Sequence, residues 1–110
     1  MQNIPILTLP RKATAVITAE RFVSPTGAVA TAAGNAFGVA RSNAVVGETF
    51  PVDVLGTAIV VAAAAIADGA EIEVGAAGQA VTKSAGKVVA RAMQAAVGAG
   101  SRIEVLLISN

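Results

Sequence analysis

The spacing of turn residues constrains the fold of this chain more than any other feature of its sequence. Glycine- and proline-containing turns recur roughly every 8–12 residues, the spacing typical of β-sandwiches and barrels. Ser24-Pro25-Thr26-Gly27 carries proline and glycine at the second and fourth positions of a β-turn, and Asp68-Gly69 is a hairpin turn signal. Between turns, segments such as 49–55 and Glu71–Val74 alternate with the period of two expected of a half-buried strand. The sequence therefore predicts a mainly β chain, folded as a compact single-domain sandwich or barrel-like structure of short strands.

Two alanine-rich stretches, 62–67 and 90–96, favour helix by intrinsic propensity, because alanine is the best helix former. Both lie between β-branched runs and glycines, so we expect at most one short helix. Because Pro51 lies inside the strand predicted at 49–55 and cannot donate a ladder hydrogen bond, we expect that strand at a sheet edge. Further short strands are predicted at 16–17, 21–23, 81–82, 88–93 and 102–108.

A weak internal repeat runs through the chain. Val39-Ala40-Arg41 is echoed by Val89-Ala90-Arg91, 50 residues later, and the strand pattern at 52–55 returns at 103–106, 51 residues later. Each copy consists of a turn of small residues followed by an apolar–charged–apolar strand. The repeat predicts two related β units packed on each other.

The first twelve residues differ in character from the rest. Two prolines fix the backbone and favour extended conformations, so residues 1–12 are predicted to form an extended N-terminal arm, with the β-rich domain at 13–110. A plain disordered terminus is the alternative, but the arm is too apolar to prefer water, and we expect it to dock on a partner. Its basic end is the one local cluster of cations and suits an acidic surface. The candidate partner-binding residues are Ile4, Pro5, Ile6, Leu7, Leu9, Pro10, Arg11 and Lys12.

The composition excludes several chemistries. Without histidine or cysteine the chain has no imidazole base, no thiol nucleophile and no Cys- or His-ligated metal. Gly86-Lys87 is followed by Val88 rather than by the serine or threonine that a P-loop requires. Glu71 and Glu73 are the one close carboxylate pair, a pattern more typical of a solvated strand face. We therefore predict no catalysis, no cofactor and no metal.

Charge and hydropathy exclude two further partners and favour a third. A net charge of +1, with no aromatic residues among the cations, does not suit nucleic acid. The longest uncharged central stretch, 54–67, has fourteen residues, whereas a membrane helix needs about 20. The N-terminus lacks the features of a signal peptide, so we expect a soluble protein that is not exported through a cleaved signal. Because 55% of residues are hydrophobic and 14% charged, part of the surface is expected to be covered by other subunits or by a partner.

Several segments together resemble a known family. They are Gly38-Val39-Ala40, Ala44-Val45-Val46-Gly47-Glu48, 52–58, 67–70, 86–92 and 100–107. From about Ala13 to Ile108 the chain is similar to the capsid decoration, or cement, proteins of tailed bacteriophages, of the small β-rich kind long catalogued as a domain of unknown function.

The resemblance implies a structural virion protein that is made in the host cytoplasm and lies on the outer surface of the phage head. Such a protein would cement neighbouring major capsid subunits and stabilise the expanded capsid, without catalysis. It implies a homo-oligomer, with a trimer favoured and a dimer possible, and an arm that lies along the capsid or a neighbour, adding β pairs and apolar contact. The alternatives are another phage assembly subunit, such as a tail, spike or surface component, and a small glycan- or ligand-binding β domain.

Overall fold

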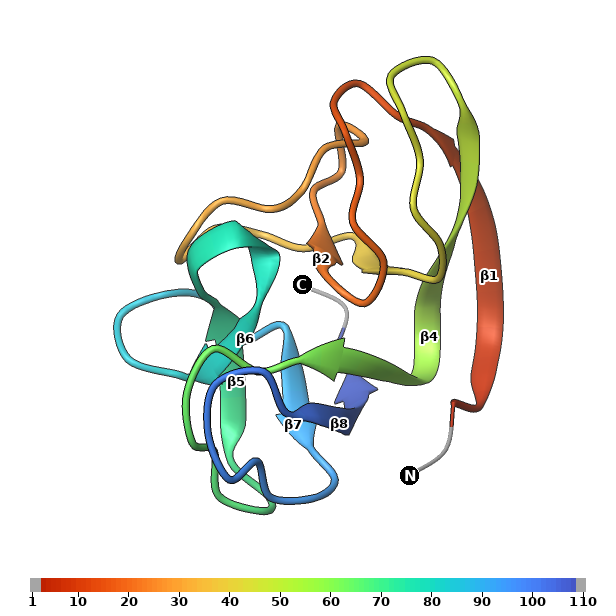
Figure 1. The fold of residues 1–110 in the computed structure, drawn as a ribbon. Helices are drawn as coiled ribbons and strands as arrows, with labels where there is room; N and C mark the ends of the chain where they lie inside the picture. The colour runs from red at the N-terminus through yellow and green to blue at the C-terminus, as the bar shows by residue number, and fades with distance from the viewer. Residues whose placement is uncertain (1–2, 109–110) are drawn as a thin grey trace.

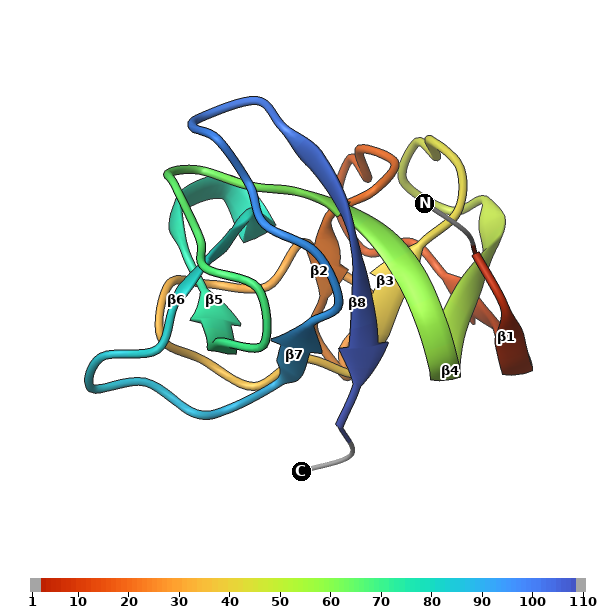
Figure 2. The same ribbon diagram turned by 90° about the horizontal axis from the view of Figure 1, so that it is seen from below.

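One long, bent strand organises the structure. The computed structural model describes residues 3–108, and in it β4 (Thr49–Val61) runs along both halves of the molecule (Figures 1 and 2). The bend falls at Gly56, whose φ of +96° is a conformation that residues with a Cβ rarely adopt. The first part of β4 pairs with β1 (Pro5–Lys12) and with β3 (Gly38–Ala40), and the last part pairs with β8 (Arg102–Leu107).

The remaining elements complete a nearly closed, barrel-like sheet. They are β2 (Phe22–Val23), β5 (Glu71–Val74), η1 (Ala76–Gly78), β6 (Ala80–Thr82) and β7 (Ala90–Ala92). Strands follow the order β2-β3-β4-β8-β7-β5-β6, and β1 lies beside β4. The mainly β fold predicted from the sequence is confirmed. Neither alanine-rich stretch forms an α-helix, and η1 is a single 3-10 turn.

The edge position expected for the strand around Pro51 is wrong. This part of β4 is paired on both sides, with Pro51 opposite Pro10 of β1. The sheet tolerates the proline because the last residue of β3 to pair with β4 is Ala40, opposite Val52. The missing N–H therefore falls just beyond the end of that ladder, while the carbonyl of Pro51 still accepts a hydrogen bond from the Arg41 amide at 3.2 Å.

The two related units predicted from the internal repeat are present. The first unit comprises residues 5–55 and the second unit residues 57–107. In the first unit β1 pairs with β4 from Thr8–Asp53 to Lys12–Thr49, and in the second unit β4 pairs with β8 from Thr57–Leu106 to Val61–Arg102. Adding 49 to the β1 residue numbers and 53 to the β4 residue numbers of the first unit gives the pairs of the second unit. The pair 8–53 becomes 57–106, and the pair 12–49 becomes 61–102.

Loop hydrogen bonds repeat in the same way. Ile17 and Ala44 exchange two backbone hydrogen bonds in the first unit, as Ile66 and Ala96 do in the second. The amide of Glu20 donates to the carbonyl of Ala40, as that of Gly69 does to Ala92. Glu20 shares the left-handed conformation of its counterpart, with φ values of +63° and +82°. Two segments of different sequence therefore fold to one backbone plan, with β4 ending the first unit and beginning the second.

Each unit has its own core. The core of the first unit is formed by its own residues alone: Ala13, Ile17, Val23, Ala40, Ala44, Phe50 and Val52, with Val29, Phe37 and Val54 partly buried against them. The core of the second unit also contains three residues from the first unit, namely Phe22, Ala30 and Val39. The units are therefore packed in series. The face of the first unit that carries Phe22 and Val39, which we call its back, packs against a face of the second unit that we call the front of that unit.

Candidate partner-binding surface

The segment predicted as an N-terminal arm is extended and forms β1, which pairs with β4 of its own chain from Pro5 to Lys12. The β pairs expected with a neighbour are therefore made within the molecule. Residues 1 and 2 of the predicted arm lie outside the described residues. Every side chain of β1 is at least partly exposed, so the strand lies on the surface of the domain (Figure 1).

Four apolar side chains form an exposed strip where β1 meets the bend of β4. The strip consists of Ile4, Ile6, Leu7 and Leu55, whose exposed fractions are 54%, 80%, 38% and 38%. The pairing register shifts on either side of Leu7, which leaves Ile6 without a partner in β4. Such a bulge redirects a side chain out of the ladder. Ile4, Ile6 and Leu7 are among the residues that the sequence predicts as partner-binding. Leu55, which was not predicted, lies opposite Leu7 in β4.

The outer edge of β1 is poorly suited to pairing with another strand. Because Pro10 lies opposite Pro51, these two residues cannot exchange backbone hydrogen bonds, and the nitrogen of Pro10 faces away from β4. The outer edge therefore lacks a donor at its centre. A proline, a bulge and Lys12 are three of the devices that protect sheet edges from strand addition. A partner would therefore contact β1 through side chains.

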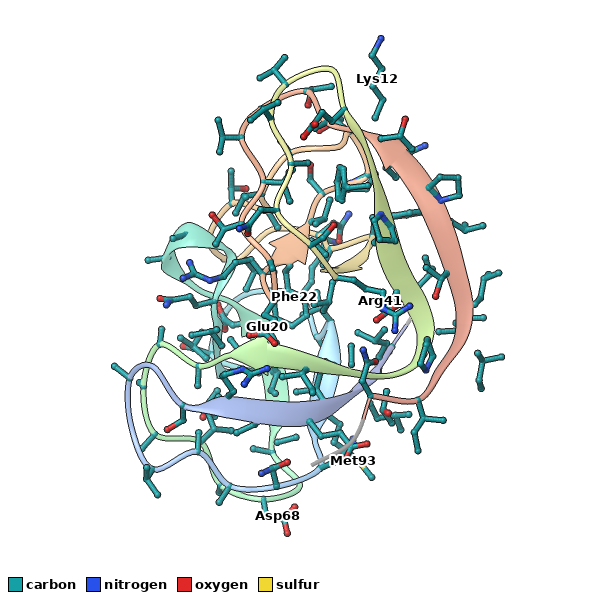
Figure 3. All side chains as sticks on the ribbon, turned by 45° about the vertical axis from the view of Figure 1, so that its right-hand side comes forward. Lys12, Glu20, Phe22, Arg41, Asp68 and Met93 are labelled. Atoms are coloured by element: carbon teal, nitrogen blue, oxygen red, sulfur yellow. The ribbon has the colours of Figure 1, made fainter. Side chains whose placement is uncertain are left out.

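The basic end of β1 lies beyond the strip. The guanidinium of Arg11 lies 4.8 Å from the centre of the Phe37 ring and donates a hydrogen bond to the carbonyl of Pro25. Within residues 3–108, neither Arg11 nor Lys12 forms an ion pair. Lys12 projects from one end of the molecule, and Asp68 and Met93 lie toward the other (Figure 3).

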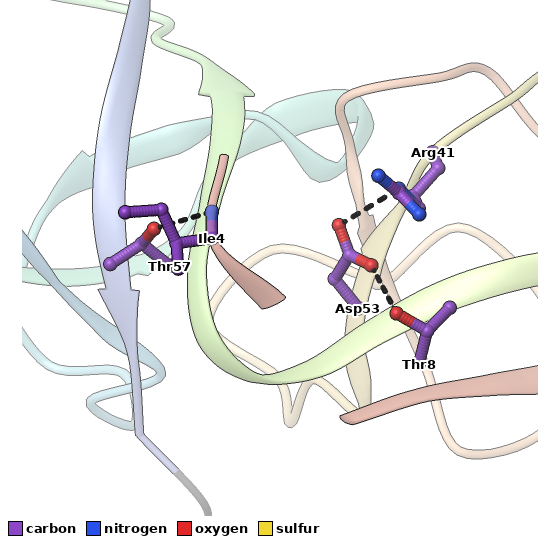
Figure 4. A network of polar contacts seen from close by, with 5 residues as sticks. All are labelled: Ile4, Thr8, Arg41, Asp53 and Thr57. Atoms are coloured by element: carbon purple, nitrogen blue, oxygen red, sulfur yellow. Dashed lines mark hydrogen bonds and ion pairs between the residues drawn. The ribbon is translucent and has the colours of Figure 1, made fainter. Parts of the chain in front are cut away.

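Polar contacts, one of them to a buried carboxylate, hold β1 on the domain. Asp53 is 1% exposed, accepts a hydrogen bond from the hydroxyl of Thr8 at 2.9 Å and lies 3.4 Å from Nε of Arg41 (Figure 4). At the start of β1, the amide of Ile4 donates to the hydroxyl of Thr57 at 2.9 Å, and the amide of Thr57 donates to the carbonyl of Ile4 at 3.0 Å. A buried carboxylate costs stability unless it is paired and hydrogen-bonded, so these contacts fix the position of β1. The sequence does not mark Asp53 as buried, because it occupies a polar position of an alternating strand.

The two acidic residues of β5 have separate structural roles. Glu71 lies 3.8 Å from Arg91, and both side chains are about half exposed. Glu73 is buried and accepts hydrogen bonds from the amides of Ser84 and Gly86, so it holds the loop that joins β6 to β7. The solvated face expected for the pair therefore holds for Glu71 alone. Among residues 3–108 no group of three or more acidic, histidine or cysteine side chains is placed to hold a metal ion.

Two other apolar surfaces lie apart from the strip. A hollow of about 320 Å³ between the loops at 16–18 and 43–48 is lined in part by Val16 and Val45. Val97 is 94% exposed on the loop between β7 and β8. Within residues 3–108 no helix is long and apolar enough to span a bilayer.

This fold occurs in a protein of a phage head. The N base of the head fiber of bacteriophage phi29 has the same fold, with a TM-score of 0.76, 20% sequence identity and 93% of each chain covered. A family model described as phage cement protein matches residues 1–107. A search of the curated proteins found no match. The protein is thus a structural protein of a bacteriophage.

Because the family model covers nearly the whole chain, the chain belongs to the phage cement protein family. Membership confirms the resemblance drawn from the glycine turns and small apolar strands. It associates the chain with the phage capsid, and the family and the phi29 protein are structural rather than enzymatic.

Proposed function

We propose that this protein binds the outer surface of the phage head through the strip Ile4, Ile6, Leu7 and Leu55, and that it cements neighbouring major capsid subunits in the expanded capsid. The observation that carries the proposal is the 80% exposure of Ile6, at a bulge of β1, within a strip that lies on the paired strands β1 and β4. Exposed apolar side chains gathered on one part of a surface are typical of an interaction site. The similar phi29 protein is described as the base of a head fiber, which supports a head-bound role for this fold.

The partners in this proposal are the major capsid protein and further copies of the chain, with a trimer favoured over a dimer. Cementing requires that one bound unit contact more than one capsid subunit. The strip supplies one contact, and oligomerisation would multiply it without new residues. The side-chain mode of contact agrees with the protected outer edge of β1.

The test is co-sedimentation of the purified protein with phage heads stripped of it, before and after expansion. Saturable binding to expanded heads, at a fixed ratio to capsid subunits, is expected, and the ratio distinguishes trimer from dimer. Burial of an isoleucine side chain stabilises a complex by about 1.5–3 kcal/mol. Since about 1.4 kcal/mol corresponds to tenfold in affinity, Ile6→Ser is expected to weaken binding at least about tenfold.

Val97→Ser is the matched control, because it removes an even more exposed aliphatic side chain elsewhere in the molecule. It is expected to change head binding by less than about twofold. Absence of binding by the unmodified protein to heads of the matching phage would overturn the cement role. Equal losses in the two variants would instead show that the strip is not the contact.

A further inference from the structure

The series packing of the two units leaves different surfaces at its two ends. At the junction, Phe22 and Val39 on the back of the first unit are fully or almost fully buried in the core of the second unit. By the shared register, Phe22 paired with Val39 corresponds to Glu71 paired with Arg91 in the second unit. The back of the second unit thus carries an exposed ion pair where the first unit carries an apolar pair. In repeat architectures a polar outer face of this kind caps the end of a series.

The front of the first unit is the opposite end, and it is open. In the second unit, the front positions Ala58, Val60 and Val89 are 0%, 0% and 2% exposed. The corresponding residues of the first unit are Leu9, Arg11 and Phe37, and each of them is partly exposed. The correspondence of Phe37 with Val89 is direct, since the amide of Phe37 donates to the carbonyl of Val23 as that of Val89 donates to Ile72. We call Leu9, Arg11 and Phe37 the open front.

Arg11 gives the open front a chemical preference. It occupies the place of the fully buried Val60, stacked over an aromatic ring and hydrogen-bonded to a backbone carbonyl. An arginine held in this way loses little side-chain freedom when its remaining donors bind a carboxylate. Of the five arginines, Arg41, Arg91 and Arg102 each have an acidic partner, whereas among residues 3–108 Arg11 and Arg21 have none. Arg21 donates to the carbonyl of Ala77 in the second unit, so Arg11 is the unpaired arginine at the open front. Arginine and aromatic residues are also the commonest energetic centres of interfaces.

We infer that the open front determines the specificity of head binding by taking a carboxylate-bearing side chain, flanked by aliphatic groups, from the head shell protein. The inference rests on the proposed function and names the chemistry that its partner must present. A second copy of the chain fits less well, because its equivalently placed back surface carries Glu71, which is already paired with Arg91. The carboxylate would bind the guanidinium while the aliphatic groups cover Leu9 and the Phe37 ring.

The experiment measures head binding of four variants over a range of NaCl concentrations. Arg11→Gln removes the charge and keeps a stem that covers the ring, and Arg11→Lys keeps the charge without the planar fork. Phe37→Leu removes the ring, and Lys87→Gln removes one positive charge from an exposed loop of the second unit. Loss of one member of a close charge pair at an interface is costly, so Arg11→Gln is expected to weaken binding at least about tenfold and to reduce its salt dependence. Arg11→Lys and Phe37→Leu should weaken binding less than Arg11→Gln does but more than Lys87→Gln does. Lys87→Gln should bind within about twofold of the unmodified protein.

The outcomes separate the inference from the proposed function. If the unmodified protein saturates expanded heads and Arg11→Gln binds them equally well with the same salt dependence, the inference is wrong and the cement role stands. If the unmodified protein does not bind heads, the proposed function fails first. Thermal unfolding of each variant is measured in parallel. If Arg11→Gln does not fold, the affinity of Arg11→Lys for heads is used instead, and binding equal to that of the unmodified protein at every salt concentration overturns the inference. If Arg11→Gln and Glu71→Gln both dissociate an oligomer in solution, the occupant is a second copy, which also overturns the inference.

Discussion

Replacing Gly56 by alanine tests how β1 is held on the bend of β4. The substitution both strains the backbone, because Gly56 has a positive φ, and brings a Cβ against the backbone of β1. A Cβ at this position would lie 2.4 Å from the carbonyl oxygen of Ile4 and 2.7 Å from the amide nitrogen of Ile6. Gly47 provides a matched control, because its φ is +93° but a Cβ there would meet nothing within 4 Å. The difference between the two alanine variants therefore isolates the contact with β1.

The magnitudes follow from the contacts. A left-handed backbone costs a residue with a Cβ roughly 1–2 kcal/mol, and alanine recovers about 0.4–1 kcal/mol by restricting the unfolded chain. Gly47→Ala should therefore lower the free energy of unfolding by about 1 kcal/mol. Gly56→Ala should also disrupt the two hydrogen bonds between Ile4 and Thr57, at about 0.5–1.5 kcal/mol each, for a total of about 2–4 kcal/mol.

Thermal unfolding followed by circular dichroism measures both effects. An unfolding entropy of about 2.1 cal/mol/K per residue gives about 0.23 kcal/mol/K for 110 residues. The melting temperature should thus fall by about 4 °C for Gly47→Ala and by about 9–17 °C for Gly56→Ala. Amide exchange at the start of β1 should increase in Gly56→Ala alone. Equal destabilisation of the two variants, with unchanged exchange, would refute the placement of Ile4 and Ile6 against the bend.

Two further substitutions test the junctions between strands and the correspondence of the two units. Gly38→Ala places a Cβ 2.2 Å from the carbonyl oxygen of Asp53, so β3 must move away from β4; chemical denaturation should show a loss of about 3 kcal/mol or more, and a loss below about 1 kcal/mol would contradict the packing. Glu20→Gly introduces the residue that the second unit has at the same left-handed position. The glycine relieves backbone strain, which stabilises the fold. It also removes the ion pair with Arg102 and gives the unfolded chain more freedom, both of which destabilise the fold. Because these effects oppose each other, the free energy of unfolding should change by less than about 1 kcal/mol. The hydrogen bonds that Arg102 donates to the Glu20 carboxylate, and then the charge of that carboxylate, raise the pKa of Arg102. The guanidinium therefore stays charged below that pKa, and the effect of Glu20→Gly should not vary between about pH 6 and about pH 9. A loss above about 2 kcal/mol would show that the ion pair matters more than its exposure implies.

Much of the fold was predictable because its strands carry local signals. The alternation at Glu71–Val74 and the segment 102–108 predicted β5 and β8 almost residue for residue. The echo between 39–41 and 89–91 indicated a repeat but not its register, since the backbone hydrogen bonds make Ala40 equivalent to Ala92, 52 residues later, rather than to Ala90. The alanine-rich stretch at 90–96 became a strand and a loop, since burial of Ala90 and Ala92 in the sheet outweighs the helix propensity of alanine.

The candidate surface was predictable only in part. The hydrophobicity of Ile4, Ile6 and Leu7 could be read directly from the sequence, but the contacts with β4 that hold these residues in place could not. The bend at Gly56 and the buried Asp53 bring together residues about 45 positions apart, and no local pattern encodes such a contact. The open front depends on comparing the two units in three dimensions, because Arg11 and Val60 correspond in register and have no similarity in sequence.

The most direct test of the proposed head-binding surface is an electron cryomicroscopy reconstruction of expanded heads saturated with this protein. Density for the protein is expected on the outer surface, with β1 still paired to β4 of its own chain and Ile6 and Arg11 facing the capsid subunits. A decorated head in which β1 has left β4 to pair with a capsid strand, or in which the Val97 loop faces the shell, would contradict the proposal.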